Sequence, residues 1–144
     1  MYYIRVDLGS KSGLGHLNRS ISLIKYLKIK NYKIIVDNPL DEFLKKFNKN
    51  RIINLYNKGE KFLNESDDAK KFIKKIANKK KTIVIKDSYR FGYKWEKIVS
   101  KFAKKIIIID DFINRKHFAD FYINHNPKFL RPNAVELDIL KKNN

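Results

Sequence analysis

Cysteine is absent from this chain of 144 residues, and histidine occurs only three times, at wide separation. Without thiols the protein forms neither a disulfide framework nor a thiolate metal site, and three separated histidines do not make a ligand set. The sequence therefore predicts no structural metal, and no motif in it requires a cofactor.

Long apolar runs are missing as well. No stretch approaches the roughly 18 apolar residues of a membrane-spanning helix, and no basic segment leads into an apolar one at the N-terminus. We therefore expect a cytoplasmic protein with no membrane span. The hydrophobic share of 43% is nevertheless large enough for one domain of ordinary size to fold by itself.

Acidic residues are few beside basic ones, which gives a formal net charge of +18. Such a charge attracts polyanions, nucleic acid included, in a salt-dependent way. Lysine supplies nearly all of it, while arginine, which binds phosphate and guanine as a fork, occurs six times. The lysines scatter along the chain, and their tightest run, Lys79-Lys80-Lys81, lies between an expected helix and an expected strand. Because lysine, isoleucine and asparagine are all abundant, as in proteins of AT-rich genomes, we expect no specific nucleic-acid partner.

Apolar residues alternate between two spacings along the chain. Short apolar runs predict strands at 2–8, 32–36, 52–55, 82–85, 105–109 and 121–124. Helical spacing predicts helices at about 17–31, 40–48, 69–77 and 95–102, the third of them capped by Ser66 or Asp67. Strands that alternate with helices in this way predict an α/β fold, a Rossmann-like doubly wound and mostly parallel sheet.

The run Gly13-Leu14-Gly15-His16-Leu17-Asn18-Arg19 stands between the first expected strand and the first expected helix. Glycines just before a helix let backbone N–H groups converge on an anion and leave room for a large ligand. Such turns are common in α/β proteins, but a histidine and an arginine within the first helical turn favour an enzyme site for a phosphorylated substrate. The alternative for His16 is a buried histidine that supports the turn.

Further polar residues follow the other predicted strands. They are Asp7, Asp87-Ser88-Tyr89, Asp110-Asp111 and Asn124-His125-Asn126. Because ligands bind outside the carboxyl ends of parallel strands, we expect these residues to line one crevice together with His16. Any single one of them could instead cap a helix or turn the chain. We expect His117 and His125 in surface loops.

These motifs resemble, in their order, those of the UDP-sugar hydrolases of pseudaminic acid biosynthesis, as do Arg115-Lys116-His117 and Asp120. The resemblance runs from about Ile4 to Asn126 and covers the N-terminal half of such enzymes. Members of the family, also described as spore-coat polysaccharide biosynthesis proteins, are related in fold to the two-domain GT-B glycosyltransferases. They hydrolyse UDP-2,4-diacetamido-2,4,6-trideoxy-β-L-altropyranose to UDP and the free sugar.

The resemblance implies that His16 is the catalytic histidine, acting as general base toward water, and that Tyr89 lines the same site. The residues expected to bind the nucleotide-sugar substrate are Gly13, Gly15, Arg19, Asp87, Asp110, Asp111, Asn124 and Asn126. The sequence departs from the family at Ser88, where many members have histidine, and in the aromatic-rich segment 118–122. Both departures indicate a divergent branch, which leaves the identity of the sugar open.

The family's second domain, which carries much of the uridine and diphosphate binding, has no counterpart in this sequence. We expect residues 1–126 to form the Rossmann-like N-terminal domain and residues 127–144 a C-terminal tail or the start of a linker. The chain is then a truncated product, one half of a split enzyme that needs a separate C-terminal-domain polypeptide, or an isolated domain. A non-catalytic partner and a related glycosyltransferase stay open as alternatives.

Overall fold

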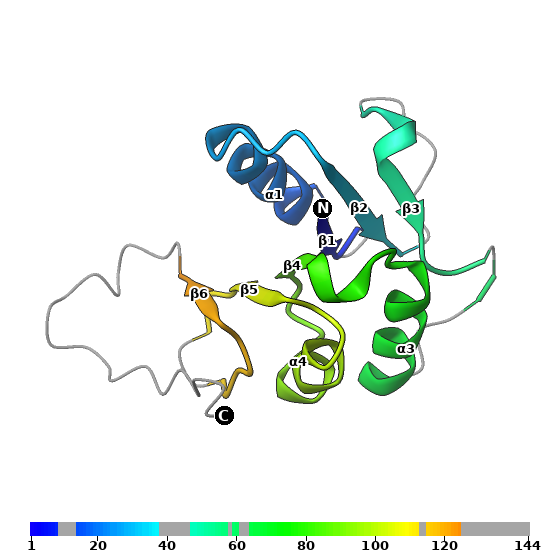
Figure 1. The fold of residues 1–144 in the computed structure, drawn as a ribbon, viewed down its shortest axis with the longest axis vertical. Helices are drawn as coiled ribbons and strands as arrows, with labels where there is room; N and C mark the ends of the chain where they lie inside the picture. The colour runs from blue at the N-terminus through cyan, green and yellow to red at the C-terminus, as the bar shows by residue number, and fades with distance from the viewer. Residues whose placement is uncertain (9–13, 38–46, 58, 61–63, 113–114, 125–144) are drawn as a thin grey trace, which may run out of the picture.

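Six parallel strands in the order β3-β2-β1-β4-β5-β6 form the sheet of the computed structural model (Figure 1). Their bounds are β1 (Tyr2–Val6), β2 (Tyr32–Val36), β3 (Ile52–Asn54), β4 (Ile83–Asp87), β5 (Lys105–Ile109) and β6 (Phe121–Ile123). The structure describes residues 1–8, 14–37, 47–57, 59–60, 64–112 and 115–124. Outside these ranges lie the expectations for Gly13, His125 and Asn126, for residues 40–46 of the helix predicted at 40–48, and for the tail at 127–144.

Every strand pairing in the sheet is parallel, which confirms the predicted Rossmann-like fold. Each predicted strand is present, and its bounds differ from the prediction by no more than two residues. The central pair, β1 and β4, is in register from Tyr2 beside Ile83 to Val6 beside Asp87. The carboxyl ends of these two strands therefore lie side by side.

The helices divide between the two faces of the sheet. They are α1 (Gly15–Tyr26), α3 (Glu65–Lys75) and α4 (Tyr93–Ser100), with the 3₁₀ turns η1 (Lys49–Arg51) and η2 (Lys79–Lys81). Figure 1 shows α1 on one side of the sheet and α3 and α4 on the other. Leu17 and Ile24 of α1 pack with Ile4 on one face, whereas Phe72 of α3 and Trp95 of α4 lie in the core of the other face. Because side chains alternate along a strand and both faces are covered, the strands are nearly continuous apolar runs.

Two helix ends differ from the sequence prediction. The side chain of Asn64 caps α3 by accepting a hydrogen bond from Asp67 N at 3.1 Å, so the predicted caps Ser66 and Asp67 are wrong. The helix begins one turn earlier than its apolar stripe, because its first turn consists of polar residues that include Glu65, Asp67 and Asp68. At the other end, α1 stops at Tyr26 rather than near residue 31, because Lys28 adopts a left-handed backbone conformation with φ 53° that ends the helix.

A fully buried arginine interrupts the apolar face that α3 and α4 cover. Arg5 in β1 forms a fork with Asp68 of α3, with Nε 3.2 Å from Oδ1 and Nη2 2.7 Å from Oδ2. The hydroxyl of Tyr56 and the indole N–H of Trp95 also donate to Asp68, at 2.9 and 2.8 Å. These donors satisfy the buried carboxylate and join β1, α3 and α4 at one point.

The strand order places a topological switch point between β1 and β4. From β1 the chain continues through α1 on one face, and from β4 it continues through α4 on the other. In such sheets the two connections diverge at the carboxyl edge and leave a crevice where ligands bind. None of the described helices is long and apolar enough to cross a membrane.

Candidate functional site

His16 stands in the first turn of α1, at the carboxyl edge of the sheet, and its side chain is almost fully buried. Its Nδ1 lies 2.6 Å from Oδ1 of Asp87, the last residue of β4. An N–H on Nδ1 donates to this carboxylate, and the neutral ring then carries its lone pair on Nε2. Arg19 Nη2 also lies 3.1 Å from Nδ1. The shorter contact with the carboxylate favours the tautomer whose Nε2 can accept a proton.

Asp87 is completely buried and accepts hydrogen bonds on both oxygens. Arg19 binds it as a fork, with Nε 2.9 Å from Oδ2 and Nη2 2.5 Å from Oδ1, and the Ser20 hydroxyl donates to Oδ2 at 3.2 Å. Burial alone would raise the pKa of Asp87, but the hydrogen bonds from His16 and Arg19 outweigh burial and lower this pKa below its usual value. The ionised carboxylate thus positions His16 and Arg19 together.

The Tyr89 ring packs against the imidazole of His16. The two ring centroids are 4.6 Å apart in an edge-to-face arrangement, and Phe112 meets the Tyr89 ring in the same way at 4.9 Å. The Tyr89 hydroxyl donates to Oδ2 of Asp111, which also lies 3.5 Å from Arg19 Nη1. Burial and the neighbouring Asp111 raise the pKa of Tyr89, so its hydroxyl stays protonated and serves as a donor.

Asp110 belongs to a neighbouring cluster rather than to the contacts around His16. Its Oδ1 accepts from Phe112 N at 2.9 Å, and its Oδ2 lies 3.6 Å from both Arg115 Nη1 and His117 Nε2. Arg115 also donates to the backbone oxygen of Tyr89 at 2.6 Å. Asp110 thereby supports the segment after β5 that carries Phe112, and Arg115 links it to the segment after β4 that carries Tyr89.

His117 is buried, so its expected place in a surface loop is wrong. Its Nδ1 lies 2.8 Å from Oε1 of Glu96, a buried residue of α4 that also accepts from Lys86 Nζ at 2.7 Å and from Phe118 N at 2.6 Å. Burial opposes ionisation of Glu96, but His117 and Lys86 outweigh it and lower its pKa. No local sequence pattern predicts this cluster, because its members come from β4, α4 and the segment before β6.

Asp7 was expected in the crevice with His16, but its side chain contacts Ser88 and Arg90 instead. Its Oδ2 accepts from the Ser88 hydroxyl at 2.7 Å, and its Oδ1 accepts from Arg90 Nη2 at 2.6 Å. Arg90 also pairs with Asp37, which follows β2. Asp7 therefore fastens β1 to the segment after β4 and contributes no contact to His16.

The structure brings only some of the sequence-predicted residues together around His16. Those that the structure brings together are His16, Arg19, Asp87, Tyr89 and Asp111. Gly15 begins α1, and a Cβ at this position would meet no atom within 4 Å. Asn124 follows β6, which lies two strands away from β4, the strand that ends in Asp87.

Two residues of the site were missing from the sequence prediction. Ser20 lies four positions after His16, so the helical period places both on the side of α1 that meets Asp87. Phe112, directly after Asp111, is an exposed aromatic at the carboxyl edge. The first could have been found from helix spacing, whereas the second has no distinguishing signal in the sequence.

Among the described residues, no group of three histidine or acidic side chains could hold a metal ion. The ion pairs there are instead between carboxylates and arginine, lysine or histidine side chains. Comparison with known proteins adds no relative, since no family model and no curated protein matches the chain.

Proposed function

We propose that the chain binds a nucleotide-activated sugar at the carboxyl edge of its sheet, and that His16 acts as general base in hydrolysis at the anomeric carbon. The observation that carries this proposal is the 2.6 Å bond between His16 Nδ1 and Asp87 at the switch point of the sheet. A histidine that is oriented in this way by a buried carboxylate presents Nε2 as the proton acceptor. The resemblance to UDP-sugar hydrolases of pseudaminic acid biosynthesis supplies the substrate class.

The reaction needs one base and one good leaving group. Water oxygen forms a bond to the anomeric carbon while the bond from that carbon to the diphosphate oxygen breaks, and its electron pair leaves with UDP. The proton of the water passes to Nε2 of His16 and then to solvent. In-line attack inverts the configuration at the anomeric carbon, and positioned general-base catalysis typically contributes about 10²–10⁴-fold to the rate.

The residues around His16 support the binding of a phosphorylated substrate. No side chain caps the N-terminus of α1, and its first turn contains no acidic residue, so its backbone N–H groups and its dipole favour an anion there. Arg19 adds a cation that Asp87 and Asp111 hold at the same edge. The Tyr89 ring supplies an apolar surface for the sugar, and its hydroxyl oxygen, whose proton goes to Asp111, can accept a hydrogen bond from a sugar hydroxyl.

Replacement of His16 by glutamine tests the proposal directly. Release of UDP from a UDP-diacetamido-trideoxyhexose is measured for the wild-type chain, for His16→Gln, and for each in the presence of a candidate C-terminal-domain polypeptide. His16→Gln lowers the rate of UDP release by about 10²–10⁴-fold while the circular dichroism spectrum is unchanged. His117→Gln is the matched control, because His117 also contacts a carboxylate through Nδ1 but lies in the neighbouring cluster.

Two results would contradict the proposal. One is near-normal UDP release by His16→Gln under conditions in which the wild type is active. The other is transfer of the sugar to an added acceptor in place of release of the free sugar, which would assign a glycosyltransferase. Binding of UDP-sugar, followed by calorimetry, separates a chain that binds without turnover from one that does neither.

A further inference from the structure

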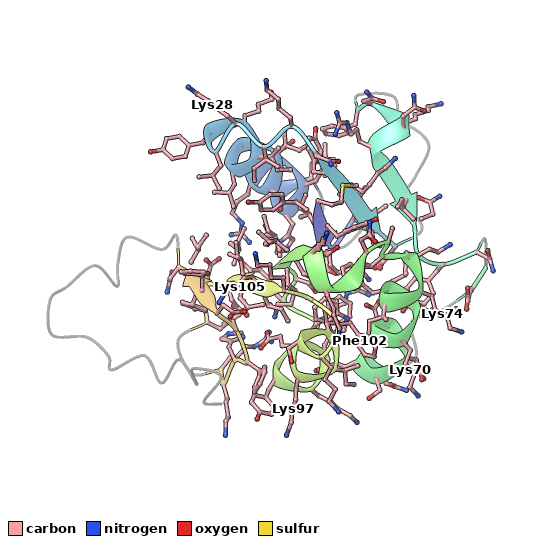
Figure 2. All side chains as sticks on the ribbon, viewed as in Figure 1. Lys28, Lys70, Lys74, Lys97, Phe102 and Lys105 are labelled. Atoms are coloured by element: carbon pink, nitrogen blue, oxygen red, sulfur yellow. The ribbon has the colours of Figure 1, made fainter. Side chains whose placement is uncertain are left out.

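The lysines that scatter along the sequence gather in space at the amino edge of the sheet, opposite to the candidate site. The segments after α1, in η2 and after α4 each lead into the start of a parallel strand, so they return to the same edge. Exposed lysines in these segments are Lys28, Lys30, Lys80, Lys81, Lys101 and Lys104. Figure 2 labels Lys28 just after α1 and Lys105 at the start of β5.

Backbone hydrogen bonds hold these segments next to one another. Three bonds join them in succession: Tyr2 N to Asn31 O at 2.9 Å, Ile83 N to Met1 O at 3.1 Å, and Lys104 N to Thr82 O at 2.8 Å. The segments that precede β2, β1, β4 and β5 therefore form a continuous row. Lysines on this row share one surface although they are far apart in the sequence.

Few of the described acidic side chains lie at this edge. Among the residues that the structure describes, Asp120 alone lies there, and it pairs with Lys105 at 2.9 Å. The other described acids lie at the carboxyl edge or in the first halves of α3 and α4. Helix dipoles favour lysines in the last turn of a helix, but the lysines of η2 lie beyond the end of α3. The amino edge is thus a basic surface that its own carboxylates do not neutralise.

Large apolar side chains are exposed on the same edge. Of the five that the described residues expose, four lie there: Tyr26, Leu27, Phe102 and Phe121. Tyr26 is 83% exposed, and Figure 2 labels Phe102 just beyond the end of α4. These apolar side chains share the amino edge with the exposed lysines, so the edge offers both kinds of contact.

A depression of about 410 Å³ opens on this edge, lined by Ile76, Asn78, Lys80 and Lys81. Two ammonium groups and a side-chain amide are donors suited to a phosphate, whereas Ile76 gives the depression an apolar wall. Both kinds of contact are needed by a molecule that carries a phosphate next to an apolar chain. Phospholipid headgroups have this combination.

We propose that the amino edge docks on a bilayer that contains anionic phospholipids. The lysines lie against the headgroups, Tyr26, Leu27 and Phe102 enter the interface, and the depression holds the phosphate of one headgroup. Docked in this way, the protein presents its carboxyl edge, and His16 with it, to the aqueous side. The proposal does not depend on the reaction assigned to His16.

The composition of the edge favours a bilayer over nucleic acid. Among the described residues its cations are mostly lysines, and Arg51, just before β3, lies over the ring of Tyr32 at 4.6 Å and donates to Lys30 O at 2.7 Å. Sequence-reading nucleic-acid surfaces rely on arginine forks to base edges, and the rings of Tyr26, Phe102 and Phe121 share this edge with the aliphatic Leu27, which does not stack with bases. A membrane interface accepts aliphatic and aromatic side chains alike, while lysines extend around them to the headgroups.

Co-sedimentation of the full chain with vesicles tests this proposal. Vesicles of phosphatidylcholine with roughly 30 mol% phosphatidylglycerol bind the protein, vesicles of phosphatidylcholine alone do not, and salt at about 1 M releases it. The double variant Lys80→Gln/Lys104→Gln binds roughly 30-fold more weakly, about fivefold for each lysine. Tyr26→Ser also weakens binding, although it leaves the net charge unchanged.

The matched control is Lys94→Gln/Lys116→Gln, which removes the same charge from exposed lysines near the start of α4, at the other edge. This variant binds as the wild type does, and thermal melts check that all variants fold. Equal weakening of the two double variants would mean that net charge alone holds the protein to vesicles, which overturns the proposal. Displacement from vesicles by single-stranded RNA at equal phosphate concentration also overturns it and assigns the edge to nucleic acid.

Discussion

Replacement of Asp87 by asparagine tests the charged centre of the site, because it keeps the shape of the side chain and removes its charge. The carboxylate accepts from His16 Nδ1, from two nitrogens of Arg19 and from the Ser20 hydroxyl. An amide in the same place has one oxygen and one NH₂ group, so on one side of the group a donor faces a donor. The guanidinium of Arg19 also loses its charged partner.

The cost follows from the number of donors left without an acceptor. Two unmatched donors beside a fully buried group cost about 1–3 kcal/mol each. Arg19 recovers part of this because its side chain is 21% exposed and lies 3.5 Å from Asp111. We therefore expect the free energy of unfolding to fall by about 2–3 kcal/mol near neutral pH, which lowers Tm by roughly 6–10 °C in a domain of this size.

The free energy of unfolding that Asp87→Asn loses depends on pH, because the folded protein lowers the pKa of Asp87. The folded state then binds this proton less readily than the unfolded state does. This stabilisation is complete above the unfolded pKa of about 4 and disappears as the pH falls through the folded value. The difference in the free energy of unfolding between wild type and Asp87→Asn therefore narrows below about pH 4.

Urea denaturation at several pH values between about 7 and 3 measures this difference. Asp67→Asn is the control, because it removes one carboxylate from the first turn of α3, where solvent screens it, and we expect a loss below about 1 kcal/mol. An Asp87→Asn protein as stable as the wild type at neutral pH would refute the reasoning. A difference that stays constant down to about pH 3 would refute the assigned ionisation of Asp87.

Three further variants test the rest of the fold. Lys86→Met leaves Glu96 buried without its cation and lowers the free energy of unfolding by about 3–5 kcal/mol, measured by urea denaturation; an unchanged midpoint would contradict the buried pair. Asn64→Ala removes the cap of α3 and costs about 1 kcal/mol, which Asn64→Asp restores, as thermal melts followed by circular dichroism check. Leu17→Ala opens a cavity under α1 and costs about 2–5 kcal/mol by the same melts; a loss below about 1 kcal/mol would mean that Leu17 does not fill the core.

Much of the fold could be predicted from the sequence because burial on both faces leaves a plain signal. The isoleucines at 106–109 and the apolar run that begins at Ile83 are strands for that reason. The end of α1 could not be predicted, since it depends on the backbone conformation of Lys28 rather than on an apolar pattern. The cap of α3 was misplaced because Asn64 precedes the acidic first turn instead of the apolar stripe.

The site was predicted in part for a related reason. His16, Arg19 and Asp87 stand at strand and helix ends, and the rule that parallel strands share a carboxyl edge brings them together. That rule does not say which way a side chain turns. Asp7 stands at the same edge and turns to Ser88 and Arg90.

The two clusters that the sequence did not predict depend on contacts between distant segments. Glu96 and His117 meet across α4 and the approach to β6, and neither stands in a motif. The basic amino edge is hidden for the same reason, because its lysines are neighbours only after the parallel strands align. Spacing along the chain records the order of residues and says nothing of which loops return to one edge.

The buried cations of β1 and β4 limit how the sequence can change. Arg5 requires Asp68 on α3, and Lys86 requires Glu96 on α4, so each helix has one acceptable position on the sheet. A slide of either helix by one turn, about 5.4 Å, would strand a charge in the interior. Relatives of this protein should therefore replace each cation and its carboxylate together. A redesigned α3 without Asp68, or a redesigned α4 without Glu96, will not pack on the sheet.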